Sequence, residues 1–292
     1  MKCVLSLLAG LSWTLLAAAT DKIPVSTFST VLTEIAEQVG GPRVIVTGHV
    51  KPGVDPHQFE PKASDMKTVS EARLILLSSK QMESYIDKLK ESTGTKAMVV
   101  QIGNDLASLR MKDEHDATRT VEDPHWWHSI AQMQKATHIV ANALAQLSPP
   151  DEEMFLANAA RYGAKLDALA KWARQQIAQL PRDQRKLVTS HDAFQYFARE
   201  HGFTVYAVEG LSSAEQPSPR HVAEIIALIK AQRVKAIFAE NFNNPKVLQE
   251  ITREAGVKLG GELYADGLGE GAAATYEGMY RHNVSTIVEG LK

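Results

Sequence analysis

The segment Ile23–Thr47 reads IPVSTFSTVLTEIAEQVGGPRVIVT and sets a pattern that the rest of the chain repeats. An apolar, β-branched run at 23–28 is followed by apolar residues at helical spacing over 30–39. Two glycines and a second β-branched run at 43–47 come next. Glycine is common just beyond a helix, and strand–helix–strand units require a parallel sheet covered by helices. The segment therefore predicts an α/β fold with a mainly parallel sheet.

The same alternation continues through both halves of the chain. We expect further strands at 72–77, 97–100, 186–189, 204–208, 236–239 and 257–264. We expect further helices at 61–71, 82–91, 129–147, 193–200, 219–231, 245–255 and 275–290. Residues 111–122 are polar and have no apolar period, so we expect a loop there.

The longest helical pattern, at 151–180, lies between the two halves and follows Pro149-Pro150. A helix of this length spans about 45 Å, enough to cross a domain. The chain has 292 residues, which favours about two domains. We predict two similar α/β lobes, 20–148 and 182–292, joined by a long rigid linker helix within 149–181. The alternative is that this helix is an ordinary surface helix of one domain.

Residues 1–19 differ in composition from the rest. Lys2 is followed by an apolar run, and the stretch ends in Ala17-Ala18-Ala19. A basic start, an apolar middle and small terminal residues are typical of a cleaved secretory signal peptide. The apolar run is shorter than the ~20 residues of a membrane-spanning helix, which argues against the alternative of a membrane anchor. We expect cleavage after Ala19 and a periplasmic location.

Cys3 is the only cysteine, and it precedes the apolar run, too early for the lipid-bearing cysteine of a lipoprotein. We therefore expect no lipid anchor. Without residues 1–19 the chain contains no thiol, so any metal ligands must be His, Asp or Glu. Loss of Lys2 leaves 31 basic residues against 34 acidic ones, a net charge of −3. This balance gives no reason to expect nucleic acid or an anionic membrane surface as a partner.

Two similar motifs present a histidine directly after Asp-Pro. They are Asp55-Pro56-His57 and Asp123-Pro124-His125-Trp126-Trp127-His128. Proline fixes its own φ and disfavours helix in the preceding residue, so each motif forms a stiff corner that holds an imidazole in one direction. Such rigid presentation suits a metal site.

Four polar residues stand where predicted strands give way to loops: His57, His125, His191 and Asp266. Ligands of open α/β sheets bind outside the carboxyl ends of the strands, so these residues can converge in a cleft between two lobes. Imidazoles combined with a carboxylate suit zinc, with manganese or iron at reduced selectivity.

Each candidate has a structural alternative, because a lone histidine after a strand is usually a surface or core residue. His128 competes with His125 for a ligand role, although it also opens a helix. We expect Trp126-Trp127 to belong to the core, and Asp55 and Asp123 to accept turn hydrogen bonds from nearby backbone. We treat the remaining histidines as structural or exposed: His49, His115, His138, His201, His221 and His282.

Four ordered motifs resemble those of the metal-binding solute receptors of ABC transporters, the cluster A-I family that serves zinc, manganese and sometimes iron. They are Gly53-Val54-Asp55-Pro56-His57-Gln58-Phe59-Glu60-Pro61, Asp123-Pro124-His125-Trp126-Trp127, Ser190-His191-Asp192-Ala193-Phe194-Gln195-Tyr196-Phe197 and Tyr264-Ala265-Asp266-Gly267-Leu268-Gly269. The resemblance covers essentially the whole chain after residue 19. It implies metal ligands at His57, His125, His191 and Asp266, two lobes that close by a small motion, and an ABC permease as partner.

The chain departs from the family pattern at two places. The segment 111–122 is short and acidic and holds only His115, whereas many zinc receptors of the family have a long His-rich loop there. Ser129 and Ile130 follow His128 where the family has a turn with an acidic residue and proline, which leaves His128 as a candidate auxiliary ligand. Manganese receptors often have glutamate at the position of His191, so histidine there favours zinc.

We therefore expect a monomeric periplasmic receptor, not an enzyme, that binds Zn(II) and delivers it to an ABC importer. A receptor for Mn(II) or iron is the alternative within the family. A secreted zinc hydrolase, with Glu60, Asp192 or Glu240 as general base, is a less favoured alternative because no compact catalytic motif supports it. A third is an adhesin or structural protein in which the metal only locks the lobes together.

Overall fold

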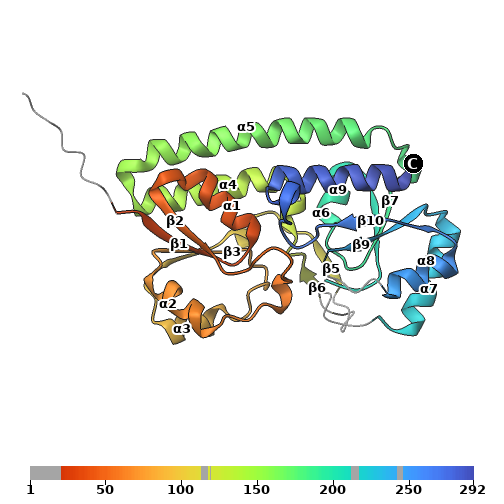
Figure 1. Cartoon of the computed structure of the whole chain (residues 1–292), viewed down its shortest axis with the longest axis horizontal. Coiled ribbons are helices and arrows are strands. Elements are labelled where there is room, and N and C mark those ends of the chain that lie inside the picture. Colours follow the sequence, from red (N-terminus) through yellow and green to blue (C-terminus); the bar gives the residue numbers. More distant parts are fainter. Residues whose placement is uncertain (1–20, 113–117, 119, 212–216, 242–245) are drawn as a thin grey trace, which may run out of the picture.

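The computed structural model describes residues 21–112, 118, 120–211, 217–241 and 246–292. Within these residues, two four-stranded parallel sheets lie side by side and one long helix runs across both (Figure 1). The expected signal peptide at 1–19 lies outside the described residues. Of the helices described, none has both the length and the apolar character needed to cross a bilayer.

The N-terminal sheet has the strand order β2-β1-β3-β4, and all neighbours are parallel. Its strands are β1 (Ile23–Thr27), β2 (Val44–Gly48), β3 (Leu74–Leu77) and β4 (Met98–Gln101). They alternate with α1 (Thr30–Gly40), α2 (Ala63–Glu71) and α3 (Ile86–Thr93). Strand β3 is buried at every residue, as its unbroken apolar sequence predicts.

The C-terminal sheet has the order β10-β9-β7-β8 and is also parallel. Its strands are β7 (Lys186–Thr189), β8 (Thr204–Ala207), β9 (Ala236–Glu240) and β10 (Lys258–Leu263). The helices of this half are α6 (Gln195–His201), α7 (Pro219–Gln232), α8 (Lys246–Ala255) and α9 (Tyr276–Leu291). In both sheets the first strand lies between the second and the third, so the two lobes share one topology. The predicted fold class is confirmed.

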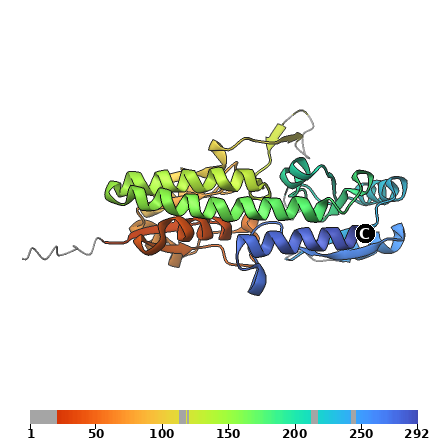
Figure 2. The same cartoon turned by 90° about the horizontal axis from the view of Figure 1, so that it is seen from above.

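Helix α5 (Glu152–Ile177) follows α4 (Ile130–Leu147) and has 26 residues, hence a length of about 39 Å. It packs against α4 and α1 in the first half and against α9 in the second (Figure 2). Its buried residues belong to one apolar core that draws on both lobes. The helix thus fits the predicted linker, while the lobe boundaries 20–148, 149–181 and 182–292 stay predictions.

Short 3-10 helices mark the connections between these elements. They span Gly41–Arg43, Pro56–Gln58, Ile102–Asp105, Trp126–His128, Pro149–Asp151, Arg182–Gln184 and Gly271–Ala273. The segments Pro56–Gln58 and Trp126–His128 belong to the two Asp-Pro-His motifs.

The loop expected at 111–122 is wrong in part. β5 (Arg110–Lys112) and β6 (Thr120–Glu122) form an antiparallel pair in which Met111 lies opposite Val121. Three-residue strands are too short to show a period in the sequence, and the pairing itself supplies their hydrogen bonds. His115 lies outside the described residues.

The helix expected from residue 82 begins later, at Ile86. In the connection before this helix, the three consecutive residues Ser79, Lys80 and Gln81 have positive φ values of 57°, 54° and 72°. The sequence did not predict this left-handed turn, because residues other than glycine rarely adopt positive φ values.

One buried carboxylate joins three helices that lie far apart in the sequence. Glu34 of α1 accepts hydrogen bonds from the Tyr162 hydroxyl of α5 (2.8 Å) and from the backbone N–H of Tyr276 in α9 (2.5 Å). Burial raises the pKa of Glu34, and these two hydrogen bonds oppose the rise. The carboxylate therefore links the N-terminal lobe to the linker helix and to the C-terminal lobe.

We predict that Glu34→Ala lowers the free energy of unfolding by roughly 2–4 kcal/mol, because it leaves two buried donors without an acceptor. Urea denaturation followed by circular dichroism measures the change. The control is Glu37→Ala, on the exposed face of the same helix, which should change stability by less than about 0.5 kcal/mol. Equal effects of the two substitutions would contradict this role for Glu34.

Candidate metal centre

The four predicted site residues reach one point from both lobes. His57 follows β2, and His125 stands directly before the turn Trp126–His128. His191 comes two residues after β7, and Asp266 comes three residues after β10. Their ligand atoms all lie within 4.8 Å of one another. The structure thus brings together all four residues that the sequence singled out.

The Asp-Pro corners act as the sequence predicted. Asp55 Oδ1 accepts a hydrogen bond from the backbone N–H of His57 (2.8 Å). Asp123 Oδ1 accepts one from the backbone N–H of His125 (2.9 Å). These short turns fix the direction in which each imidazole leaves the backbone.

The imidazole Nε2 atoms and the Asp266 oxygens, which are the potential metal-binding atoms, lie at short and similar distances from one another. His125 Nε2 lies 3.1 Å from His57 Nε2, 3.3 Å from His191 Nε2 and 3.1 Å from Asp266 Oδ1. Asp266 Oδ1 is 3.4 Å from His57 Nε2, and Asp266 Oδ2 is 3.3 Å from His191 Nε2. A tetrahedral zinc ion with bonds of 2.0–2.1 Å places its ligand atoms about 3.3 Å apart. The arrangement therefore fits a small divalent cation.

Asp266 has an unusual environment for a buried carboxylate. Neither oxygen forms a hydrogen bond of good geometry with any described residue, although imidazole nitrogens lie 3.1–3.4 Å away. The side chains of Asp266, His125 and His191 have no exposed surface, and that of His57 is 11% exposed. Buried polar atoms almost always have partners. A cation bound between Asp266 and the three imidazoles would supply the partner that these acceptor atoms lack.

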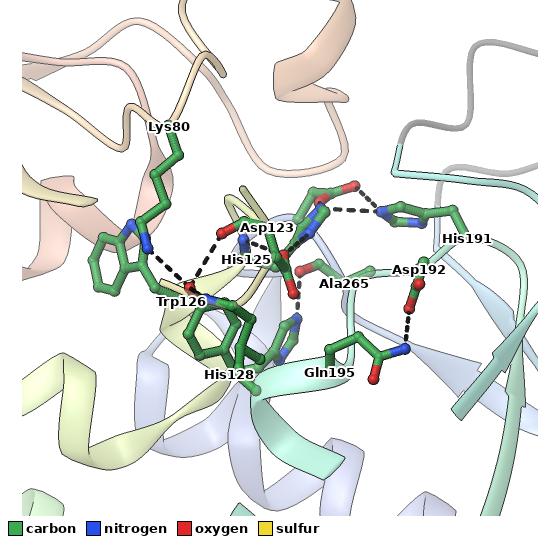
Figure 3. Close-up of polar contacts among 12 residues, drawn as sticks. Lys80, Asp123, His125, Trp126, His128, His191, Asp192, Gln195 and Ala265 are labelled. Carbon is green, nitrogen blue, oxygen red and sulfur yellow. Dashed lines mark hydrogen bonds and ion pairs between the residues drawn. The ribbon is translucent and has the colours of Figure 1, made fainter. Parts of the chain in front are cut away.

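Two of the imidazoles are oriented by a second carboxylate. Asp123 Oδ1 lies 2.8 Å from His125 Nδ1, and Glu240 Oε2 lies 2.5 Å from His191 Nδ1. An Nδ1–H that donates to a carboxylate leaves the Nε2 lone pair free for a metal and fixes the ring. Figure 3 shows Asp123 beside His125, with His191 facing them from the other lobe. Such carboxylate–histidine pairs are the usual surroundings of a metal-binding imidazole.

The charges of the site are strongly coupled. Burial alone would lower the pKa of His125, but its hydrogen bond to Asp123 and the nearby carboxylate of Asp266 raise it to about 9. Burial likewise opposes protonation of His191, yet the charges of Glu240 and Asp266 raise its pKa well above the usual value. Burial would raise the pKa of Asp266, but the imidazoles of His191 and His57 hold it well below its usual range. The cluster therefore attracts positive charge, as protons or as a metal ion.

Comparison with known proteins agrees with this geometry. The family model described as "Zinc-uptake complex component A periplasmic" matches residues 25–290. The chain belongs to this family. Its members are metal-binding solute receptors that lie outside the cytoplasm and work with ABC permease subunits. The prediction that the chain is a receptor and not an enzyme is confirmed, and the hydrolase alternative is wrong.

The relatives of this receptor differ in the metal that their names give. It is 32% identical over 282 residues to a manganese-binding lipoprotein, MntA, of Bacillus subtilis, covering 94% of this chain and 92% of that protein. It is 30% identical to the zinc-binding protein TroA of Treponema pallidum, covering 94% and 91%. The solved structure of TroA superimposes with a TM-score of 0.85 at 28% identity, covering 93% of this chain and 99% of that one.

His128 of the receptor does not join the cluster. Its Nε2 lies 2.6 Å from the carbonyl oxygen of Ala265, and burial lowers its pKa to about 4. A neutral ring that donates from Nε2 to a carbonyl has no lone pair there for a metal. Trp126 and Trp127 are fully buried, and Trp127 Nε1 also donates to Ala265 (2.8 Å). The three side chains belong to the core between the lobes.

The other described histidines also lie outside the cluster. His49 bonds Ser26 and Asp65, His201 bonds Tyr280, and His282 bonds the carbonyl of Glu262. Each of these three has a structural partner, His221 Nε2 lies 3.4 Å from the carbonyl oxygen of Ala207, and His138 is exposed. All five are thus structural or exposed, as the sequence predicted.

The role of Glu240 was not predicted from the sequence, where this residue was considered only as a general base for a hydrolase. In the structure its carboxylate lies against the Nδ1 atom of His191. Thr189 pairs with Phe238 in the sheet. His191 and Glu240 each come two residues later, so they lie side by side at the ends of neighbouring strands. An acidic residue at the end of the β9 strand was the available signal.

We predict that Glu240→Ala weakens zinc binding by roughly 10–100-fold, the usual effect of losing a carboxylate that orients a metal-binding imidazole. Competition with a zinc chelator measures the affinity. Glu250→Ala, on an exposed position of α8, is the matched control and should bind zinc like the wild type. An unchanged affinity in the Glu240 variant would show that its contact with His191 has no bearing on the metal.

Proposed function

We propose that this protein is a high-affinity zinc receptor that captures Zn(II) outside the cytoplasm and delivers it to an ABC importer. In this proposal the ion is held between the lobes by His57, His125, His191 and Asp266. The metal is the cargo of the protein, and the permease is its partner. Release follows when the permease separates the lobes and divides the ligand set.

The observation that carries the proposal is the convergence of these imidazole nitrogens and the Asp266 carboxylate at tetrahedral spacing. Zinc favours this mixture of nitrogen and oxygen ligands and has no need of a larger coordination number. Four protein ligands leave no position for an activated water, so binding proceeds without catalysis. The absence of cysteine after residue 3 restricts ligands to these residue types.

A manganese receptor is the second candidate. The similarity to the manganese-binding MntA favours it, as does the carboxylate partner on two of the imidazoles, which makes the site more anionic than three neutral rings and Asp266 alone. Against it, Zn(II) binds nitrogen and oxygen sites more tightly than Mn(II) in the general order of divalent metals.

The proposed location follows from the sequence. We propose a cleaved signal at 1–19 and a periplasmic protein without a lipid anchor, because Cys3 precedes the apolar run. We further propose a monomer with no nucleic-acid partner.

Isothermal titration of metal-free protein with Zn(II) and with Mn(II) tests the ligand set and the metal. We expect one zinc ion to bind per chain, manganese to bind more weakly, and Asp266→Ala to reduce zinc affinity by more than about 100-fold, since the loss of a ligand exceeds the loss of an outer carboxylate. Asp87→Ala, whose carboxylate is 92% exposed, is the control and should bind normally. Tighter binding of manganese than of zinc would select the second candidate.

The pH dependence of affinity provides a separate test. Because the pKa of His125 is raised to about 9 and that of His191 is also raised, both rings carry protons at neutral pH that the metal must displace. Zinc affinity should therefore rise with pH up to about 9 and fall as the solution becomes acidic, by roughly ten-fold per displaced proton and pH unit. Titration in buffers of different ionisation enthalpy counts the protons released. Zinc binding without proton release at pH 7 would contradict this picture.

A further inference from the structure

The left-handed turn before α3 directs a lysine into the protein interior. Ser79, Lys80 and Gln81 all have positive φ, a conformation that side chains with a Cβ disfavour. Strained backbone of this kind persists only where the surroundings hold it, and it often serves a functional site.

Specific hydrogen bonds hold this turn. Glu83 accepts from the backbone N–H groups of Ser78 and Ser79, both at 2.7 Å. Asn104 Oδ1 accepts from the N–H of Lys80 (3.2 Å). The exit of β3 is thus fixed in a shape that places the Lys80 side chain toward the other lobe.

Lys80 is buried, with 5% of its surface exposed, and its Nζ donates to the hydroxyl of Tyr196 in α6 (2.8 Å). Figure 3 shows Lys80 on the side of Asp123 that faces away from His191. The bond joins a residue of the N-terminal lobe to the first turn of a helix in the C-terminal lobe. A buried lysine is costly, so its partner must compensate for the water it loses.

The Tyr196 hydroxyl joins several parts of the chain. It accepts from the N–H of Leu109 (3.1 Å) and lies 3.2 Å from the carbonyl oxygen of Asp123 and 3.3 Å from that of Ala107. Its single proton can serve one of these carbonyls at a time. The hydroxyl therefore holds both ends of the β5–β6 hairpin against α6, and one of these ends is Asp123, the residue that orients His125.

The charge of Lys80 also suits this place. Asp123, Glu240 and Asp266 are buried carboxylates around the site, and a divalent ion balances two of their three charges. The carboxylates of Glu122 and Asp123 attract the Lys80 ammonium, and Asp123 Oδ2 has no hydrogen-bond partner among the described residues. Lys80 supplies a buried positive charge on the side of Asp123 remote from the metal ligands.

We propose that Lys80 is a positioning residue for metal retention, which acts through Tyr196 to hold the His125 turn against α6 and keep the two lobes closed on the ion. The inference rests on the proposed ligand set and goes beyond it, because neither Lys80 nor Tyr196 belongs to the cluster of potential ligands. Both residues control how long the metal stays bound.

Simple electrostatics predicts the opposite sign. A positive charge near a cation site repels the ion, so removal of the Lys80 charge alone would strengthen metal binding. The positioning role predicts weaker binding on the same substitution. The direction of the change therefore decides between the two.

The test measures zinc association and dissociation by stopped flow, with a chromogenic chelator, in the full-length processed protein. Lys80→Met and Tyr196→Phe should each release zinc about ten-fold faster with little change in association rate. The double variant should release it no faster than either single one, because both changes remove the same bond. Lys80→Arg, which keeps the charge and a donor, should recover part of the retention. Lys90→Met, a half-exposed lysine of α3, is the matched control and should match the wild type.

The outcomes separate the two proposals. If the wild type binds neither zinc nor manganese, the proposed function fails. If the wild type binds zinc but Lys80→Met and Tyr196→Phe release it at the wild-type rate or more slowly, the positioning role is overturned. Should Lys80→Met fail to fold, as judged by circular dichroism and melting temperature, Tyr196→Phe decides alone, because it removes only one oxygen from a retained ring.

Discussion

The buried carboxylate of Asp266 is the constraint on which the rest of the site depends. An anion without hydrogen-bond donors is among the most expensive groups to bury, and it is tolerated where positive charge faces it. Imidazoles supply that charge when protonated, and a divalent cation supplies it when it displaces their protons. The same cluster thus has a stable state with protons and a stable state with metal, and pH and metal concentration determine which one is populated.

The proposed ligands differ in burial and in the contacts that hold their side chains. His125 and His191 are fully buried, and a carboxylate orients each of their rings. His57 is partly exposed and lies in a short turn beside the exposed Gln58, with no carboxylate on its Nδ1 atom among the described residues. The fold therefore fixes His125, from the N-terminal lobe, and His191, from the C-terminal lobe, more firmly than it fixes His57.

The joint between the lobes limits how far the site can open. Helix α5 packs on helices of both lobes, one apolar core continues through them, and Glu34 joins α1 to α5 and α9. Lys80 and Tyr196 also connect the lobes, next to Asp123 in the turn that carries His125. Separating the lobes widely would expose both the shared core and these buried polar pairs, so the fold favours a small motion.

The sequence by itself determined most of the helices and strands and the main polar residues. Strand β7 lies where its β-branched run predicted, α5 follows Pro149-Pro150, and the Asp-Pro corners present His57 and His125 as their local stereochemistry requires. These features depend on residues close in sequence, whose spacing a single chain reveals. The convergence of the site could be expected because ligands gather at the carboxyl ends of parallel strands.

Only the tertiary structure decided which side chains support the candidate ligands. Glu240 reaches His191 because β9 pairs with β7, and Lys80 turns inward through three left-handed residues that no propensity predicts. His128 is excluded from the cluster by the carbonyl of Ala265, which lies 137 positions away in the chain. The β5–β6 pair was likewise invisible in the sequence. Each of these contacts joins distant segments, and their partners are set by the register and packing of the whole fold rather than by local pattern.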